Sequence, residues 1–130
     1  MLERLKKHHL GFVIPVSSMS LIEDRTGKKF IFDSIQKCHI LFEYQPILEI
    51  YFEYISQEGR ALKQDVGFAH ICYNVENSKK LKEIELLIQS KKLGYKVTEL
   101  EKSGSKECGH VVFFFLKKMG LVEFNLPEYN

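Results

Sequence analysis

The chain has 130 residues, of which 45% are hydrophobic, and its formal net charge is only +2. This length suits one domain with ample material for a packed core, and the composition argues against a disordered chain. The lysines occur in scattered pairs and form no basic stripe, so the charge pattern gives no support for a nucleic-acid partner.

The cysteine spacing and the length of the apolar runs indicate the cellular compartment in which we expect the protein. Cys38, Cys72 and Cys108 show no short spacing, which argues against both a zinc finger and a disulfide framework. No apolar run approaches the roughly 18 residues that a membrane span requires. The apolar stretch 10–16 is followed by no clean signal-peptide cleavage site. We therefore expect a cytoplasmic protein whose cysteines are reduced and packed in the core.

The first half of the chain is dominated by strand-like runs. Gln45-Pro46 interrupts them as a turn, because proline cannot donate to a sheet ladder. The segment 17–27 has room for a short helix of about two turns. The predicted strands cover residues 9–16, 29–35, 37–44 and 47–54.

In the predicted strand 47–54, acidic and aromatic residues alternate with aliphatic ones. Glu49, Tyr51 and Glu53 share one face, opposite Leu48 and Ile50. A glutamate in such a pattern usually lies on the solvated face of a strand. We expect Tyr51 and Glu53 to be exposed.

The second half begins after a polar stretch, 56–66, that reads as a linker. Asn77 is a predicted helix N-cap, and apolar residues then recur at helical spacing until Leu93-Gly94 ends the helix. The residues 101–109 form a loop rich in glycine, serine and lysine. The predicted strands of this half cover residues 67–75, 95–101, 110–118 and 120–126.

The two halves repeat one pattern, βαβββ, within a single domain spanning residues 1–130. The first module covers about 7–55 and the second about 67–127, and the linker 56–66 joins them. The segment 9–12 recurs as 70–73, and 48–50 recurs as 122–124. The predicted fold class is therefore α+β, with two tandem modules forming a cupped mixed sheet that carries the helices on its outer face.

The repeat aligns two imidazoles and two carboxylates: His9, Glu49, His70 and Glu123. Each stands singly among apolar neighbours on its strand, so all four side chains could line the concave side of one sheet. Two neutral imidazoles and two carboxylates balance the charge of one divalent cation, and this mixture favours Zn, Ni, Co, Mn or Fe over Ca or Mg. An open coordination position is typical of a catalytic site.

Other histidines were weighed against these four positions. His8 is the alternative to His9 in the first strand, but comparison with His70 favours His9, the residue directly before the Leu-Gly-Phe-Val run. His39 and His110 have no counterpart in the repeat, so we expect them to be structural.

The runs KHHLGFVIPV, GFAHICYNVEN and GLVEFNL resemble signature segments of the vicinal-oxygen-chelate superfamily, which includes glyoxalases, methylmalonyl-CoA epimerase and bleomycin-resistance proteins. The resemblance is closest to epimerase-like and small lactoylglutathione-lyase-like members. It extends from Lys7 to Leu126 and is weakest between residues 17 and 37. The metal ligands of the family lie on the first, fourth, fifth and eighth strands. The resemblance places them at His9, Glu49, His70 and Glu123.

The resemblance also implies a function. Such enzymes are metal-dependent lyases or isomerases that abstract a proton next to a carbonyl and stabilise the resulting enediolate through the metal. In glyoxalase-like members the glutamate of the eighth strand, here Glu123, serves as ligand and base. Epimerases add a carboxylate from the second-strand region, and the nearest candidate here is Asp33. The expected partner is a small-molecule carbonyl or thioester substrate, and a homodimer is a further expectation.

The sequence departs from the family at the expected substrate rim. No arginines match those that hold glutathione carboxylates, and the basic rim candidates are Arg25, Lys28, Lys29 and Arg60. The substrate therefore need not carry glutathione or coenzyme A. Two other functions stay open: a ring-cleaving dioxygenase, which would use two histidines and one glutamate around iron, and a non-catalytic drug-sequestering protein.

Overall fold

The computed structural model describes residues 4–58 and 65–127. The predicted rim residue Arg60 and part of the predicted linker fall outside these ranges. In the described residues the elements follow the predicted order. The first module consists of β1 (Lys6–Ile14), a 3-10 turn (Val16–Ser18), α1 (Met19–Thr26), β2 (Ile31–Asp33), β3 (Cys38–Gln45) and β4 (Ile50–Ser56). The second consists of β5 (Gly67–Asn74), α2 (Ser78–Ser90), β6 (Gly94–Lys96), β7 (Glu101–Lys102), β8 (His110–Leu116) and β9 (Gly120–Leu126).

Two of the predicted strands differ from the structure. The strand predicted over 95–101 is divided into the short strands β6 and β7, which both pair with β8. The strand predicted over 47–54 begins only at Ile50, because the residues before it form a turn and Glu49 has a positive φ of 56°. The second difference changes the candidate site.

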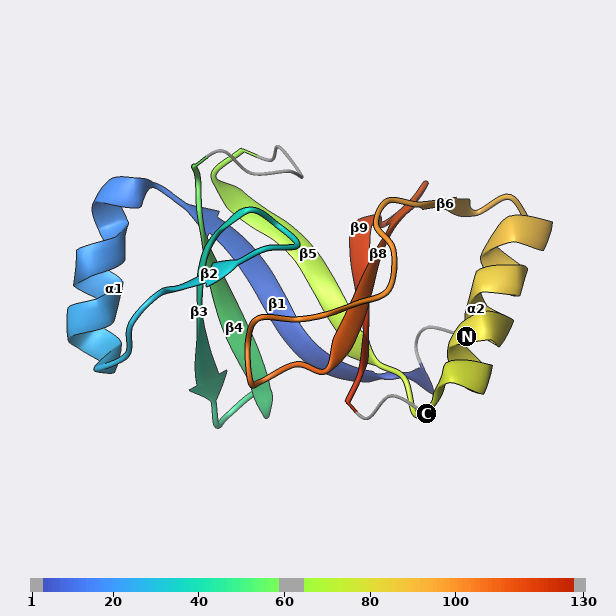
Figure 1. Cartoon of the computed structure of the whole chain (residues 1–130), viewed down its shortest axis with the longest axis horizontal. Coiled ribbons are helices and arrows are strands. Elements are labelled where there is room, and N and C mark those ends of the chain that lie inside the picture. The colour runs from blue at the N-terminus through green and yellow to red at the C-terminus, as the bar shows by residue number, and fades with distance from the viewer. Residues whose placement is uncertain (1–3, 59–64, 128–130) are drawn as a thin grey trace.

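The strands form one mixed sheet in the order β2-β3-β4-β1-β5-β9-β8-β6, with β7 beside β8. The first module supplies one half and the second module the other, and the two halves meet where β1 pairs antiparallel with β5 (Figure 1). Within each module the opening strand pairs in parallel with the closing strand, β1 with β4 and β5 with β9. The prediction of an α+β fold with two βαβββ modules is confirmed.

Alternation along the strands divides the apolar residues into two clusters on opposite faces of the sheet. On the outer face of the second module, α2 packs Leu81, Ile84 and Ile88 against strands that include β8 and β9. On the inner face, residues of both modules pack together, among them Ile40 and Phe113. The helix α1 has no buried residue, so only α2 covers its half of the sheet tightly. The two helices lie at opposite ends of the molecule (Figure 1).

The cysteines lie in the core of the protein. Cys38, Cys72 and Cys108 are all buried free thiols, as expected for small core residues. Among the described residues, neither helix is long and apolar enough to cross a bilayer.

The cap of α2 provides a test of the local sequence reasoning. The side chain of Asn77 accepts a hydrogen bond of 2.8 Å from the backbone N–H of Lys80, as the N-cap prediction requires. Asn77→Ala should lower the free energy of unfolding by about 1 kcal/mol, because one N–H of the first turn loses its partner. Chemical denaturation measures the change. Asn77→Asp keeps an acceptor at this position and should remain close to wild type; equal losses in both variants would contradict the cap assignment.

Candidate metal centre

Four side chains from four strands meet on the inner face of the sheet, and each is at most 4% exposed. They are His9 of β1, Glu53 of β4, His70 of β5 and Glu123 of β9. The two imidazole Nε2 atoms lie 3.1 Å apart. Glu53 Oε1 lies 3.2 and 3.1 Å from these nitrogens, and Glu123 Oε1 lies 2.9 and 3.0 Å from them. All four ligand atoms fall within 4.8 Å of one another.

The strand register explains why these residues meet. In the central pair, Gly11 of β1 lies opposite His70, and Cys72 of β5 lies opposite His9. The parallel neighbours then place Glu53 opposite Gly11 and Glu123 opposite Cys72. In each module the glutamate thus lies opposite the residue that follows the histidine by two positions. The two modules therefore contribute equivalent residues to the site.

The duplication extends to an aromatic wall. Phe42 lies opposite Glu53 across β3 and β4, and Phe113 lies opposite Glu123 across β8 and β9. Each phenylalanine ring meets the histidine of its own module edge to face, with ring centroids 5.0 and 5.1 Å apart. These contacts fix both imidazoles from the side and exclude water.

Gly11 is required by the close approach of His70. A Cβ at position 11 would lie 2.5 Å from Cε1 of the His70 ring. The equivalent position beside His9 holds Cys72, so the two halves of the site are not identical in packing. The absence of a side chain at Gly11 gives the His70 imidazole its place.

The structure corrects one of the four predicted ligands. It brings His9, His70 and Glu123 together, but Glu49 is an exposed turn residue outside the cluster, and Glu53 takes the fourth place. The reason is the register: Tyr51 of β4 is already opposite His9, so Glu49 precedes the paired part of the strand. The expectation that Glu53 is exposed is wrong, since it is only 2% exposed.

A divalent cation would satisfy the four donor atoms better than hydrogen bonds among the four side chains do. Glu53 Oε1 and Glu123 Oε1 are buried and have no hydrogen-bond partner in the described structure, although imidazole nitrogens lie close by. Protons on both facing Nε2 atoms of His9 and His70 would bring two N–H groups against each other. A single cation among the four atoms would satisfy all of them, with two carboxylate charges balancing the dication. The cluster could therefore hold a divalent metal ion.

Without a cation, the four groups perturb one another strongly. Burial opposes the ionised form of Glu53 and Glu123, but the adjacent imidazoles outweigh it, so the pKa of each carboxyl is held below its ordinary value. Burial likewise opposes the imidazolium forms, yet Cys72 and Glu123 raise the pKa of His9, and Glu123 and Glu53 raise that of His70. In the absence of a cation, the carboxyl groups thus favour their ionised form and the imidazoles their protonated form.

Asp33, the predicted second carboxylate, is buried and connected to the cluster through one side chain. The backbone N–H of Gln36 donates to Asp33 Oδ2 at 3.2 Å, and the Gln36 side-chain amide donates to Glu53 Oε2 at 3.0 Å. Asp33 Oδ1 is buried without a hydrogen-bond partner. Burial, and next the negative charge of Glu53, raise the pKa of Asp33. Sequence reasoning missed Gln36, because nothing in the four-residue turn 34–37 indicates a link between two carboxylates.

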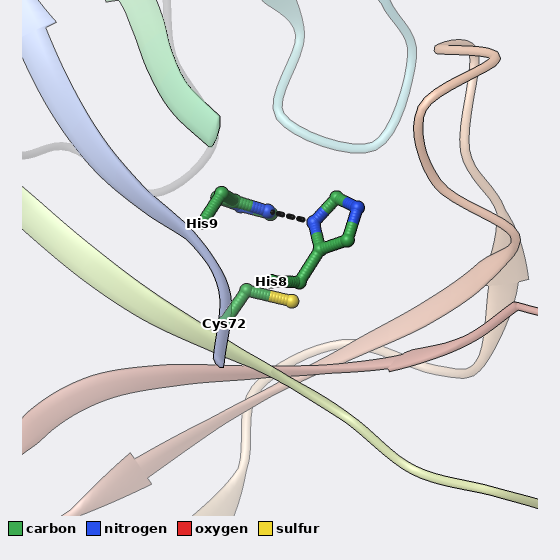
Figure 2. A group of neighbouring side chains, drawn as sticks. All are labelled: His8, His9 and Cys72. Carbon is green, nitrogen blue, oxygen red and sulfur yellow. Dashed lines mark hydrogen bonds between the residues drawn. The ribbon is translucent and has the colours of Figure 1, made fainter. Parts of the chain in front are cut away.

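His8 lies directly behind His9 and is not one of the four. Its Nδ1 is 2.7 Å from Nδ1 of His9, and its Nε2 is 2.8 Å from the carbonyl oxygen of Glu107. Figure 2 shows the hydrogen bond between the two rings, whose planes lie at 80° to each other, with Cys72 beside them. Burial, together with the charge of His9, lowers the pKa of His8.

The neighbouring thiols and the other histidines stand apart from this chemistry. Cys72, His8 and His9 are close enough to form a second metal-binding group. However, burial raises the pKa of Cys72 and brings that of Cys108 to about 11, which keeps both as neutral thiols. His39 pairs with Glu58 outside the cluster, as expected for a structural residue.

A cavity of about 440 Å³ adjoins the site on the side of Phe42. Two of the predicted rim residues, Lys28 and Lys29, line it, whereas Arg25 forms an ion pair with Glu43 instead. The cavity is lined by Lys28, Lys29, Ile31, Ile40, Leu41, Phe42, Gly104, Lys106 and Glu107. Phe42 lines the cavity and its ring contacts His9, so this residue lies between the cavity and the cluster.

Solved structures share this arrangement of strands. A variant of methylmalonyl-CoA epimerase from Streptomyces coelicolor, in complex with 2-nitronate-propionyl-CoA, matches with a TM-score of 0.60 and 15% identity over 94% of this chain and 97% of that chain. The 2,3-dioxygenase LapB from Pseudomonas sp. KL28 matches with a TM-score of 0.59 and 13% identity, over 94% of this chain and 40% of that chain. Homoprotocatechuate 2,3-dioxygenase from Brevibacterium fuscum matches with a TM-score of 0.54 and 13% identity, over 96% and 37%.

These matches show a common fold and leave the reaction open. The chain spans nearly all of the epimerase but less than half of either dioxygenase. No protein-family model matches the sequence, and no curated protein sequence matches it.

The two glutamates of β4 and its turn provide a matched pair of variants. Glu53→Gln removes a charged donor from the cluster and should weaken binding of Zn²⁺ or Co²⁺ roughly tenfold or more. Glu49→Gln makes the same chemical change on an exposed turn and should leave the affinity unchanged. Isothermal titration calorimetry on both variants measures the difference. A loss confined to Glu49→Gln would restore the ligand set expected from the sequence.

The shifted pKa values predict how the stability of the metal-free protein depends on pH. Because the pKa values of His9 and His70 are raised in the folded protein, protonation of these imidazoles stabilises the fold fully below pH 6.5. This contribution is lost as the pH rises through the pKa values that the imidazoles have in the folded protein. Because the pKa values of Glu53 and Glu123 are lowered in the folded protein, ionisation of these carboxyl groups stabilises the fold above pH 4.5. That contribution is lost as the pH falls through the pKa values that the carboxyl groups have in the folded protein. Thermal unfolding in chelator should thus show falling stability above pH 6.5.

Added Zn²⁺ should reverse this alkaline trend. Metal competes with protons for the same four groups, so the gain in Tm on adding metal should grow as the pH rises from 6.5. Stability in chelator that does not fall above pH 6.5 would contradict the assigned charge states.

Proposed function

We propose that this chain, which has the fold of the vicinal-oxygen-chelate superfamily, is a metal-dependent lyase or isomerase of the glyoxalase or epimerase type. Its reaction would remove a proton from a carbon next to a carbonyl group of a small molecule. The observation that carries the proposal is the convergence of His9, Glu53, His70 and Glu123 at one buried point. The fold match to an epimerase over nearly the whole length of both chains supports it.

The four side chains would hold one divalent ion of Zn, Ni, Co, Mn or Fe. Two imidazole nitrogens and two carboxylate oxygens suit these ions, and the buried oxygens without partners are the groups that a cation would satisfy. When bound, the ion would supply a Lewis acid that polarises a carbonyl oxygen. The residues around it exclude water, which strengthens each electrostatic contact within the site.

Asp33 is the carboxylate best suited to move the proton. It would accept the proton as the C–H bond breaks and return it to the same carbon or to a neighbouring one. Its pKa is raised by burial and by the charge of Glu53, which makes it a stronger base than an ordinary aspartate. Glu123, the other candidate base, has its pKa held down by two imidazoles and is better suited to remain a ligand.

The adjoining cavity favours a substrate that carries a negative group. Lys28, Lys29 and Lys106 line it, and Glu107 is the one carboxylate among its lining residues. Ile31, Ile40 and Phe42 supply apolar surface beside these charges. A carbonyl compound or thioester with an anionic part would match this lining. Homodimer formation and cytoplasmic location remain predictions from the sequence.

A ring-cleaving dioxygenase is the second candidate, since two such enzymes share the fold. Enzymes of that type use two histidines and one carboxylate around iron. The second buried carboxylate, Glu53, argues against it here. Consumption of oxygen with a catechol and Fe²⁺ would reverse this order.

Metal analysis of the purified protein is the first test of the function. We expect about one equivalent of a divalent transition metal, removable by chelator and restored by titration. The loaded protein should then be assayed with methylglyoxal hemithioacetal and with 2-methyl acyl thioesters, including solvent deuterium exchange at the carbon next to the carbonyl. Failure of the wild-type protein to bind any of these metals would reject the proposal.

Substitution of Asp33 tests its assigned role in proton transfer. Asp33→Asn should lower kcat roughly 10²- to 10⁴-fold, because general-base catalysis contributes this much, while metal affinity stays near wild type. In the wild type, the acid limb of the pH–rate profile should lie above 3.8, since the pKa of Asp33 is raised from that value. Asp24→Asn on the exposed face of α1 is the control. Full activity in Asp33→Asn would move the role to another group.

A further inference from the structure

We propose that His8 is a positioning residue that sets the tautomer and orientation of His9 and links this histidine to the loop 103–109. The inference rests on the proposed metal centre, since it concerns how one of the ligands is presented. His8 is not one of the four residues of the cluster, and its ring is only partly buried.

A β-bulge brings His8 to the inner face. Along the pair of β1 and β5, Lys7 lies opposite Tyr73 and His9 lies opposite the next residue, Cys72, so His8 is an extra residue in β1. In a regular strand two consecutive side chains point to opposite faces, but a bulge re-aims one of them. Here it allows the rings of His8 and His9 to form a hydrogen bond with each other (Figure 2).

The hydrogen-bond partners determine the tautomers. The carbonyl oxygen of Glu107 can only accept, so the Nε2 of His8 that lies 2.8 Å from it must donate. The Nδ1 of a neutral His8 is then an acceptor, and the Nδ1 of His9 at 2.7 Å donates to it. His9 therefore keeps a proton on Nδ1, so its Nε2, which faces His70, Glu53 and Glu123, is the nitrogen whose lone pair would bind a cation.

The duplicated half of the site shows what happens without such a residue. A second bulge lies on β5, where Ala69 is the extra residue directly before His70, as His8 is directly before His9. Alanine has no hydrogen-bonding side chain, and the Nδ1 of His70 is buried without a partner in the described structure. The two histidines thus have the same register and the same phenylalanine contact, but only His9 has an imidazole behind it.

The same hydrogen bond joins the two modules. His8 belongs to the first strand of the chain, whereas Glu107 belongs to the loop between β7 and β8. Glu107 also forms an ion pair with Lys28 at 3.5 Å and lines the adjoining cavity. A shift of this loop would therefore reach the His9 ring through one intermediate side chain.

Two substitutions of His8 separate hydrogen bonding from packing. His8→Phe keeps a planar ring that can stack on Tyr51, as His8 does with ring centroids 5.3 Å apart, but it removes both hydrogen bonds. His8→Gln keeps one donor and one acceptor. We expect His8→Phe to weaken Zn²⁺ binding roughly 10- to 100-fold, the usual effect of losing a residue that orients a ligand, and His8→Gln to recover part of the loss. His39→Gln, at a histidine outside the cluster, is the control.

Nitrogen-15 spectra of the histidine rings give a readout that a purely structural role would not change. In wild-type protein, His8 should show a protonated Nε2 and an unprotonated Nδ1, and the Nδ1–H of His9 should exchange slowly with water. In zinc-loaded His8→Phe, that N–H should exchange faster. Unchanged zinc affinity and unchanged exchange in His8→Phe would overturn the inference.

The outcome can be told apart from failure of the proposed function. If wild-type protein binds no metal, the function fails, and the ring spectra of the metal-free protein still test the hydrogen bonds of His8. If wild-type protein binds metal and His8→Phe binds it equally well, the function stands and the role of His8 is refuted.

Discussion

The antiparallel pairing of β1 with β5 is the constraint on which the rest of the structure depends. It joins the two modules edge to edge and places Gly11 opposite His70 and His9 opposite Cys72. The strand that pairs in parallel with each histidine strand then places a glutamate beside that histidine. A shift of this pairing by one residue would turn the histidines to the opposite face, because side chains alternate along a strand.

The pairing also brings ionisable groups together in the buried interior of the protein. Two carboxylates and two imidazoles lie almost completely buried, and removal of ionised groups from water costs several kcal/mol each unless partners compensate. Here each group lies about 3 Å from oppositely charged or metal-binding atoms. Since two of the oxygens still lack hydrogen bonds, the arrangement is better explained by binding of a cation than by stability of the protein alone.

The two halves of the site are similar in arrangement and differ at particular residues. The histidine, the glutamate and the phenylalanine wall occur in both halves, but the residue before the histidine is His8 in one module and Ala69 in the other. The residue two positions after the histidine is glycine in one and cysteine in the other. The two helices differ as well, because α2 buries three apolar residues and α1 buries none. The halves thus share the arrangement of histidine, glutamate and phenylalanine and differ in what surrounds it.

The sequence by itself determined the order of the elements, the two modules and three of the four residues at the centre. Hydrophobic periodicity and the Asn77 cap are local properties, so they can be read directly. The repeated histidine motif and the final strand likewise identify His9, His70 and Glu123. The alternation in 47–54 predicts one face for Glu49 and Glu53, but Glu49 lies in a turn with a positive φ and not in the strand.

Only the tertiary structure decided between those two glutamates. The choice depends on where the turn after β3 ends and on which residue of β4 lies opposite His9, and both follow from pairing between distant strands. The hydrogen bonds of Gln36 and His8 also depend on tertiary structure. The first requires the turn between β2 and β3, and the second requires the bulge in β1 and a loop of the second module. Local pattern sets the face that a side chain occupies, whereas register between strands sets which side chains meet.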